Sequence, residues 1–151
     1  MERIASFSVD HDKIVEGIYI SRIDGDIVTY DMRTRIPNEG DYMSNLTMHS
    51  MEHMFATYVR NSDIGDKVIY FGPMGCRTGF YLLVRDVEPE RVAETVKKVL
   101  LQIAEHDGEM FGATRKECGN YRELDIDAAK AEAASYLRKL EDRVIDFKYP
   151  D

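Results

Sequence analysis

The segment NLTMHSMEHMFATYV, residues 45–59, decides how the rest of the chain can be arranged. It contains the motif His49-x-x-Glu52-His53, and residues four apart in a helix lie one above the other on the same face. Their Cβ atoms are then roughly 5–6 Å apart, so both imidazoles can bind one metal ion. Apolar residues recur at helical spacing on the opposite face, namely Met51, Met54, Phe55, Tyr58 and Val59. The pattern therefore predicts a helix that packs through one face and presents two histidines and a glutamate on the other.

The histidine motif alone leaves two interpretations open. Two histidines and a glutamate on an amphipathic helix can form a solvated polar face as readily as a metal site. Cys118, in the polar loop segment KECGN, could supply a third ligand. Three such ligands leave a fourth position for water or substrate, as in catalytic metal sites. Taken by itself, however, Cys118 is better explained as an incidental loop thiol.

The second cysteine, Cys76, directly follows the turn segment GPMG, residues 72–75. Glycines at a turn permit unusual dihedral angles and a close approach of a ligand to the backbone. A thiol at the mouth of a strand can be exposed, and a nearby cation or metal favours its reactive thiolate form. For an arbitrary cysteine, a small core residue at the start of a strand is the more common role.

Composition narrows the class of protein. The chain has 151 residues, of which 44% are hydrophobic and 32% charged, which predicts one globular domain, residues 1–151, with a sizeable core. A formal charge of −8 argues against nucleic acid or an anionic membrane as partner. No apolar run is long enough to cross a bilayer, and no signal peptide is visible. The two distant cysteines predict free thiols and not a disulfide, so we expect a cytoplasmic protein.

Five segments have the alternation or apolar run of a strand: residues 6–9, 17–23, 27–32, 68–71 and 76–84. The Asp24-Gly25 step between the second and third of these predicts a hairpin. Residues 36–41 are expected to form a loop because Pro, Asn and Gly favour turns.

Three helices are predicted. The histidine helix should begin after Ser44 or Asn45 as N-cap and end before Gly65. A second helix should begin at Pro89 and end near Gly108, with an inward face that consists of Val92, Val96, Val99, Leu100 and Ile103. A third should begin after Asp125 or Asp127, with an inward face that consists of Ala133, Tyr136, Leu137 and Leu140. Hairpins followed by separate helices predict an α+β fold, a mainly antiparallel sheet with helices packed against it.

Taken together, the motifs closely resemble the LuxS family, the S-ribosylhomocysteine lyases that make the autoinducer-2 precursor. The likeness covers roughly residues 6–137 and rests on five motifs in the same order, Ser6-Phe7-x-x-Asp10-His11, Asp31-Met32-Arg33, His49-x-x-Glu52-His53, the segment PMGCRTG at 73–79 and the segment ECGN at 117–120.

The resemblance implies cleavage of the thioether of S-ribosylhomocysteine to homocysteine and 4,5-dihydroxy-2,3-pentanedione. A thioether leaves readily only when a carbonyl lies at the carbon β to it. The sugar carbonyl must therefore migrate from C1 to C3 by two enolisations before β-elimination. Each enolisation needs a Lewis acid on the oxygens and a base that moves protons. The product implies a role in quorum sensing or in recycling by-products of the methionine cycle.

By resemblance, His49, His53 and Cys118 hold one divalent metal per subunit, iron(II) in the native family and zinc or cobalt in substituted forms. Cys76 shuttles protons in the early steps, and Glu52 acts as general acid and base in the later ones. No organic cofactor is required.

The resemblance also assigns a substrate-binding set, which consists of Ser6, Phe7, His11, Arg33 and Arg60. An arginine suits a carboxylate because its planar fork pairs with two oxygens. Without the resemblance, the arginines read as surface charges and Ser6 as a strand or turn residue. The family is homodimeric, and the N-terminal segment of one subunit closes over the metal site of the other. The implied assembly is thus a homodimer with active sites at its interface.

One departure from the family is visible before Pro73. The family commonly has an Asp-apolar-Ser run there, whereas this chain has Tyr70-Phe71-Gly72. A carboxylate near the substrate is therefore missing.

Two other functions remain to be separated from the lyase. An inverted-motif metallopeptidase also uses His-x-x-Glu-His, with the Glu activating water, but it would not need Cys76. A non-catalytic metal-binding module predicts a closed site with a fourth protein ligand.

Overall fold

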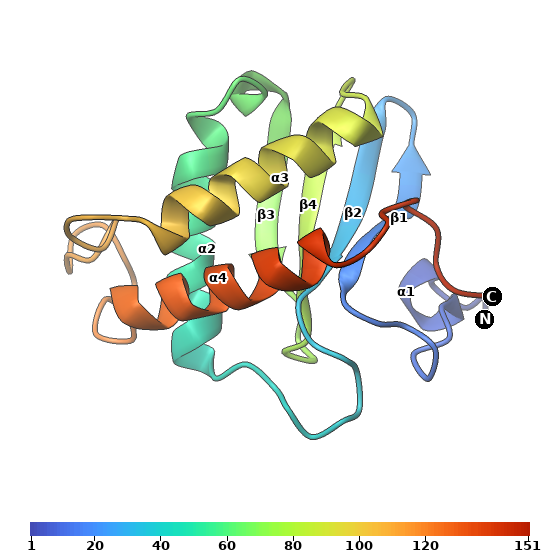
Figure 1. Ribbon diagram of the computed structural model, residues 1–151, viewed down its shortest axis with the longest axis horizontal. Helices are drawn as coiled ribbons and strands as arrows, with labels where there is room; N and C mark the ends of the chain where they lie inside the picture. Colours follow the sequence, from blue (N-terminus) through green and yellow to red (C-terminus); the bar gives the residue numbers. More distant parts are fainter.

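Four antiparallel strands form one sheet, and three long helices cover one of its faces (Figure 1). The computed structural model describes every residue from Met1 to Asp151. The elements are α1 (Ala5–Ser8), β1 (Gly17–Asp24), β2 (Ile27–Arg33), α2 (Asn45–Arg60), the 3₁₀ turn η1 (Gly65–Lys67), β3 (Val68–Pro73), β4 (Gly79–Arg85), α3 (Pro89–Ala104) and α4 (Ile126–Glu141). The strand order is β1-β2-β4-β3. The predicted α+β class is confirmed.

The first hairpin joins β1 to β2 as the Asp-Gly step predicts. Asp24 pairs with Ile27 at the end of the ladder, and Gly25 takes the first central position of the turn with φ +63°. A left-handed residue at this position matches the twist of the flanking strands. The predicted loop of residues 36–41 also lacks regular structure.

Helix α2 begins and ends where its capping residues predict. The Ser44 hydroxyl accepts a hydrogen bond from the Thr47 amide at 3.1 Å, and Asn61 caps the C-terminus. The apolar face is buried, and its side chains are Met51, Met54, Phe55 and Val59. Phe55 stacks on Phe71 of β3 with ring centroids 4.3 Å apart. This packing leaves the histidine face of α2 directed away from the sheet.

The other two long helices also follow their predictions. Pro89 opens α3, and the Asp125 side chain caps α4 by accepting from the Asp127 amide at 3.0 Å. All of their predicted inward residues are buried. Tyr136 of α4 donates to the Gly17 carbonyl at 2.6 Å and so ties α4 to the start of β1.

One predicted strand and two predicted boundaries are wrong. Residues 6–9 are not a strand, because no strand lies next to them to pair with; the segment Ala5–Ser8 forms the single helical turn α1. Strand β4 begins at Gly79 and not at Cys76, because Arg77 has φ +64° and leaves the extended conformation. Helix α3 ends at Ala104, four residues before Gly108.

The face of the sheet opposite the helices carries the termini. Helix α1 and the last residues of the chain lie together beside β1 in Figure 1. The C-terminal segment runs along β1, where Phe147 accepts a hydrogen bond from the Ile20 amide at 2.8 Å.

None of the helices combines the length and apolar character that a bilayer-spanning segment requires.

Candidate active site

The three predicted metal ligands come together at one end of the molecule. His49 and His53 project from α2, and Cys118 projects from the loop between α3 and α4. One nitrogen of each histidine and the Cys118 sulfur all lie within 4.8 Å of one another, and the three side chains are half-buried. A solvated polar face would not bring a distant loop thiol to the same point. The cluster therefore favours a metal site over an incidental arrangement.

The two imidazoles are oriented by backbone carbonyls. His49 Nδ1 lies 2.9 Å from the Glu123 carbonyl, and His53 Nδ1 lies 2.9 Å from the Phe111 carbonyl. Because a carbonyl only accepts, each Nδ1 carries the proton and each Nε2 keeps a free lone pair. A metal-ligating histidine characteristically has such a partner on its second nitrogen. Both rings are thus in the tautomer that binds a metal through Nε2.

The Cys118 sulfur is the third point of the cluster. It lies 3.4 Å from His49 Nε2 and accepts a hydrogen bond from the Asn120 amide, also at 3.4 Å. A backbone donor stabilises negative charge on sulfur, as a metal-bound thiolate requires. A hollow of about 350 Å³ lies beside the thiol, lined by Arg115, Cys118, Gly119, Asn120, Tyr121 and Arg122. Two imidazole nitrogens and one sulfur would supply three ligands to a divalent ion and leave a fourth position for water or substrate.

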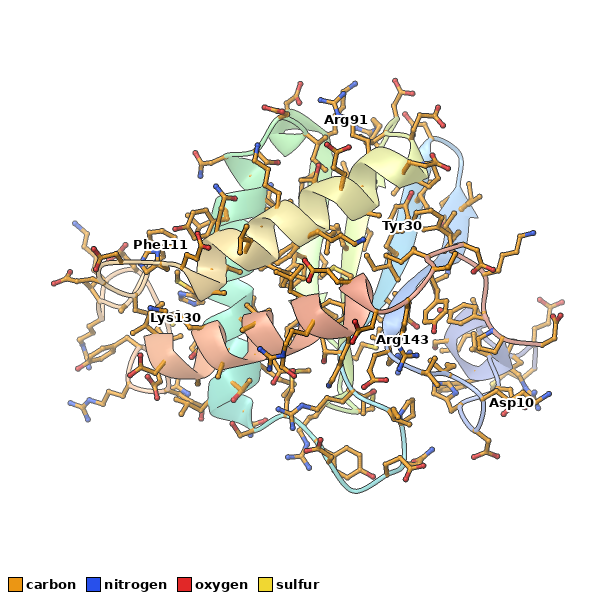
Figure 2. All side chains as sticks on the ribbon, in the orientation of Figure 1. Asp10, Tyr30, Arg91, Phe111, Lys130 and Arg143 are labelled. Carbon is orange, nitrogen blue, oxygen red and sulfur yellow. The ribbon has the colours of Figure 1, made fainter.

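The loop that holds His53 is itself anchored by His106. His106 is buried; its Nδ1 lies 2.7 Å from the Tyr58 hydroxyl and its Nε2 lies 2.9 Å from the Glu109 carbonyl. Lys130 also donates to the His106 carbonyl at 2.8 Å, and Figure 2 shows Phe111 and Lys130 at the same end of the molecule. The sequence places His106 only near a helix end, so its role in fixing this loop was not predicted.

Gly112 permits the close approach of this loop to the ligand. It has φ +65°, and a Cβ at this position would lie 2.9 Å from His53 Nδ1. Any side chain would therefore push against the imidazole that the Phe111 carbonyl orients.

Cys76 lies in the turn between β3 and β4 and is exposed. Its sulfur is 3.1 Å from Thr78 Oγ1 and 4.0 Å from Arg33 Nη1. The thiol lines a hollow of about 290 Å³ that His11 also lines. The structure thus brings together two of the residues that the resemblance selects, and surrounds the thiol with one hydroxyl and one cation.

Arg33 is held by the most deeply buried ion pair of the chain. Its Nε and Nη2 donate to the two oxygens of Asp31 at 3.1 and 2.5 Å, and its Nη1 donates to Thr78 at 2.9 Å. Burial opposes the charge of Arg33, but the hydrogen bonds and charge of Asp31 outweigh it and raise the pKa of Arg33. Only 3% of Arg33 is exposed, so it is not the surface charge that its sequence context also allows.

The partners of Arg33 had no predicted role. Asp31 and Arg33 are two apart on β2, and alternate residues of a strand share a face, so their proximity was readable in the sequence. Thr78 lies in the PMGCRTG motif but had no assigned role, and nothing in the sequence pointed to Tyr149, which donates to Asp31 from 118 residues away.

The remaining predicted residues line neither of the two hollows beside the thiols. Glu52 lies between the two histidines on α2 and is half-buried. Ser6 lines a hollow of about 390 Å³ on the open face of the sheet, and Phe7 is 70% exposed. Arg60, at the far end of α2, donates to the carbonyls of Val68 and Ile69 at 3.4 and 3.3 Å. Glu52 therefore adjoins the ligands on α2, whereas Ser6 and Phe7 come from α1 and Arg60 from the end of α2.

Tyr70 and Gly72, in the segment that departs from the family pattern, lie against each other. The Tyr70 hydroxyl lies 2.1 Å from the point that a Cβ on Gly72 would occupy. The tyrosine therefore folds back into the space of a residue 72 side chain. This places the Tyr70 hydroxyl in the side-chain position of residue 72, which therefore requires glycine.

Comparison with known proteins agrees with this geometry. A model of the S-ribosylhomocysteinase (LuxS) family matches residues 4–146. A protein of Borreliella burgdorferi (strain ZS7), named S-ribosylhomocysteine lyase, is 40% identical and aligns with 99% of this chain and 100% of its own length.

Two further relatives carry the same name. The protein from Clostridium beijerinckii is 41% identical over 93% of this chain and 92% of its own length. The protein from Phocaeicola vulgatus is 42% identical over 93% of this chain and 91% of its own length. Since the family match spans nearly the whole sequence and includes all three clustered ligands, the chain belongs to the S-ribosylhomocysteinase (LuxS) family.

Proposed function

We propose that the protein cleaves the thioether of S-ribosylhomocysteine, releasing homocysteine and 4,5-dihydroxy-2,3-pentanedione, the autoinducer-2 precursor. The observation that carries this proposal is the cluster of His49, His53 and Cys118, whose ligand atoms lie within 4.8 Å of one another in a chain of this family. All of residues 1–151 would form the single catalytic domain.

The donor set fits a divalent metal. A bound ion of this kind supplies Lewis-acid polarisation of the substrate's carbonyl and hydroxyl oxygens, which acidifies the neighbouring C–H bonds. Iron(II) is the expected native ion, and zinc or cobalt suit the same ligands because two imidazoles and a thiolate accept several divalent metals. Metal analysis of anaerobically purified protein would identify the ion.

The proton transfers fall to Cys76 and Glu52. As a thiolate, Cys76 would take a proton from one sugar carbon and return it to the next, which moves the carbonyl along the chain. The Arg33 guanidinium, 4.0 Å from the sulfur, would favour a thiolate, and the Thr78 hydroxyl, 3.1 Å away, could donate to it. Glu52, next to the ligands on α2, would serve the later enolisation and the elimination.

The site would be completed by a second copy of the chain. The hollow beside Cys118 and the hollow beside Cys76 share no lining residue. The open face of the sheet carries exposed apolar side chains, among them Phe7 and Tyr70, that a partner subunit would bury. The substrate-binding set of Ser6, Phe7, His11, Arg33 and Arg60 would then come from both subunits. Sedimentation should give twice the 17.4 kDa of one chain, and Ile4→Asp on that face should lower the mass.

The lyase is tested with metal-replete and metal-depleted protein. We expect replete protein to release homocysteine thiol from S-ribosylhomocysteine, and depleted protein to regain the activity when iron(II) is added back. A peptide library serves as the parallel substrate. No thiol release by replete protein would contradict the lyase; peptide hydrolysis instead would indicate the metallopeptidase, and a metal with a fourth protein ligand would indicate a non-catalytic module. Because both cysteines are free thiols, we also expect the protein to reside in the reducing cytoplasm.

A further inference from the structure

The C-terminal segment passes around the edge of the sheet from one face to the other. Phe147 packs on Tyr30, with ring centroids 6.2 Å apart, on the helix-covered side. It pairs with β1 through the Ile20 amide at 2.8 Å and has φ +64°, so the chain turns there. Two residues on, Tyr149 stacks on Tyr19 with centroids 4.9 Å apart. The segment thus ends against the face of the sheet that carries Asp31.

Tyr149 reaches the buried carboxylate at that point. Its hydroxyl donates to Asp31 Oδ2 at 2.8 Å, and only 1% of Asp31 is exposed. Burial and the charge of Asp31 raise the pKa of Tyr149, so the phenol stays neutral and remains a donor. The same Asp31 oxygen also accepts from Arg33 Nη2.

A continuous chain of contacts then leads to the thiol. Asp31 binds Arg33 through both oxygens, and the fork geometry of a guanidinium makes the two groups rotate as one unit. The third nitrogen of Arg33 points at Thr78 Oγ1 and lies 4.0 Å from Cys76 Sγ. A donor that fixes the plane of the Asp31 carboxylate therefore also fixes where the positive charge lies relative to the sulfur.

We propose that Tyr149 is a positioning residue for Cys76, acting through Asp31 and Arg33, so that the C-terminal segment sets the reactivity of the thiol. The catalytic part of this inference rests on the lyase proposed above. Its effect on the thiol does not, because alkylation of Cys76 can be measured without substrate.

The test compares Tyr149→Phe with Tyr19→Phe. Both variants lose one hydroxyl and keep the stacked rings, but the Tyr19 hydroxyl donates to the Val15 carbonyl at 2.7 Å and not to Asp31. The rate of Cys76 alkylation by iodoacetamide is measured at fixed pH by peptide mass mapping, which separates it from Cys118. We expect Tyr149→Phe to slow alkylation about 3- to 10-fold, as for the loss of one hydrogen bond, and Tyr19→Phe to leave it unchanged.

Two further measurements separate positioning from stability. With S-ribosylhomocysteine, Tyr149→Phe should lower kcat while the bound metal stays at the wild-type value. In an Asp31→Asn background, adding Tyr149→Phe should cause no further change in alkylation, because the hydroxyl acts through that carboxylate. Equal alkylation of wild type and Tyr149→Phe, or an additive effect in the double variant, would overturn the inference. If no variant releases thiol but the alkylation pattern holds, the lyase fails and the coupling stands.

Discussion

The two cysteines lie in sites that are built in different ways. Cys118 belongs to a cluster held by the main chain: carbonyls of Phe111 and Glu123 orient the two histidines, and a backbone amide donates to the sulfur. Cys76 is held by side chains, a hydroxyl and a guanidinium whose own position depends on a buried carboxylate. The Cys118 site is thus held by a loop that packs against α2, whereas the Cys76 site is held by a buried ion pair on the sheet.

This difference has consequences for what each site tolerates. Main-chain donors and acceptors do not change when side chains are substituted, so the metal cluster should respond mainly to its three ligands and to the path of the loop. The surroundings of Cys76 depend on the buried ion pair of Asp31 and Arg33. Removing either partner leaves an unpaired buried charge, which lowers the stability of the folded protein. Substitutions at the two sites should therefore have different consequences.

Removal of a ligand should abolish the metal site without unfolding the protein. We expect His49→Ala to lose the bound metal and all thiol release, because two remaining donors cannot hold a divalent ion as three do. Metal content and far-UV circular dichroism on the same sample check both parts. Full metal occupancy in His49→Ala would show that the cluster is not the metal site.

Removal of one partner of the buried ion pair should cost the most stability. Arg33→Met leaves the 1%-exposed Asp31 carboxylate without its cation, and we expect the free energy of unfolding to fall by roughly 3–5 kcal/mol. The double variant Asp31→Asn with Arg33→Met should recover much of this loss. Urea denaturation measures both, and equal losses in the single and double variants would contradict the buried-charge explanation.

Adding a side chain at position 112 should weaken metal binding. Gly112→Ala places a Cβ 2.9 Å from His53 Nδ1, and disturbance of a ligand's orientation typically costs about 10- to 100-fold in metal affinity. Gly40→Ala is the matched control, because Gly40 also has positive φ but nothing lies within 4 Å of its Cβ position. Competition with a chelator gives the affinities; a similar loss in both variants would point to backbone strain alone.

Alkaline pH should destabilise the folded protein through two buried tyrosines, Tyr30 of β2 and Tyr136 of α4. Burial raises the pKa of Tyr30 to about 12, and burial also raises the pKa of Tyr136 well above its usual value. The unfolded chain releases these protons near pH 10 while the folded chain keeps them, so stability is complete below pH 10 and falls above it. Each tyrosine contributes up to about 1.4 kcal/mol per pH unit in that window.

The variant Tyr30→Phe isolates one of these contributions. The Tyr30 hydroxyl is buried with no hydrogen-bond partner, so its removal should cost little at neutral pH. Its free energy of unfolding should then fall less steeply than that of wild type between pH 10 and 12. Parallel curves would mean that Tyr30 ionises in the folded state as easily as in the unfolded chain.

Local spacing in the sequence predicted the histidine pair of the cluster and most of the fold, whereas the third ligand, Cys118, was assigned only through the resemblance to the family. Residues four apart on a helix must share a face, and the apolar face of α2 is the one that packs. The strand predicted at 6–9 failed because pairing depends on a neighbour and not on local propensity. The surroundings of Cys76 were out of reach for the same reason: Asp31 and Tyr149 are 118 residues apart, and no local pattern connects them.

In the proposed reaction, the His49, His53 and Cys118 cluster binds the metal, and Cys76 transfers the protons as a separate group. Metal content and homocysteine release should be measured together on Cys76→Ala, beside wild type. We expect wild-type metal occupancy and essentially no thiol release from the variant. Thiol release at the wild-type rate by metal-loaded Cys76→Ala would contradict the account.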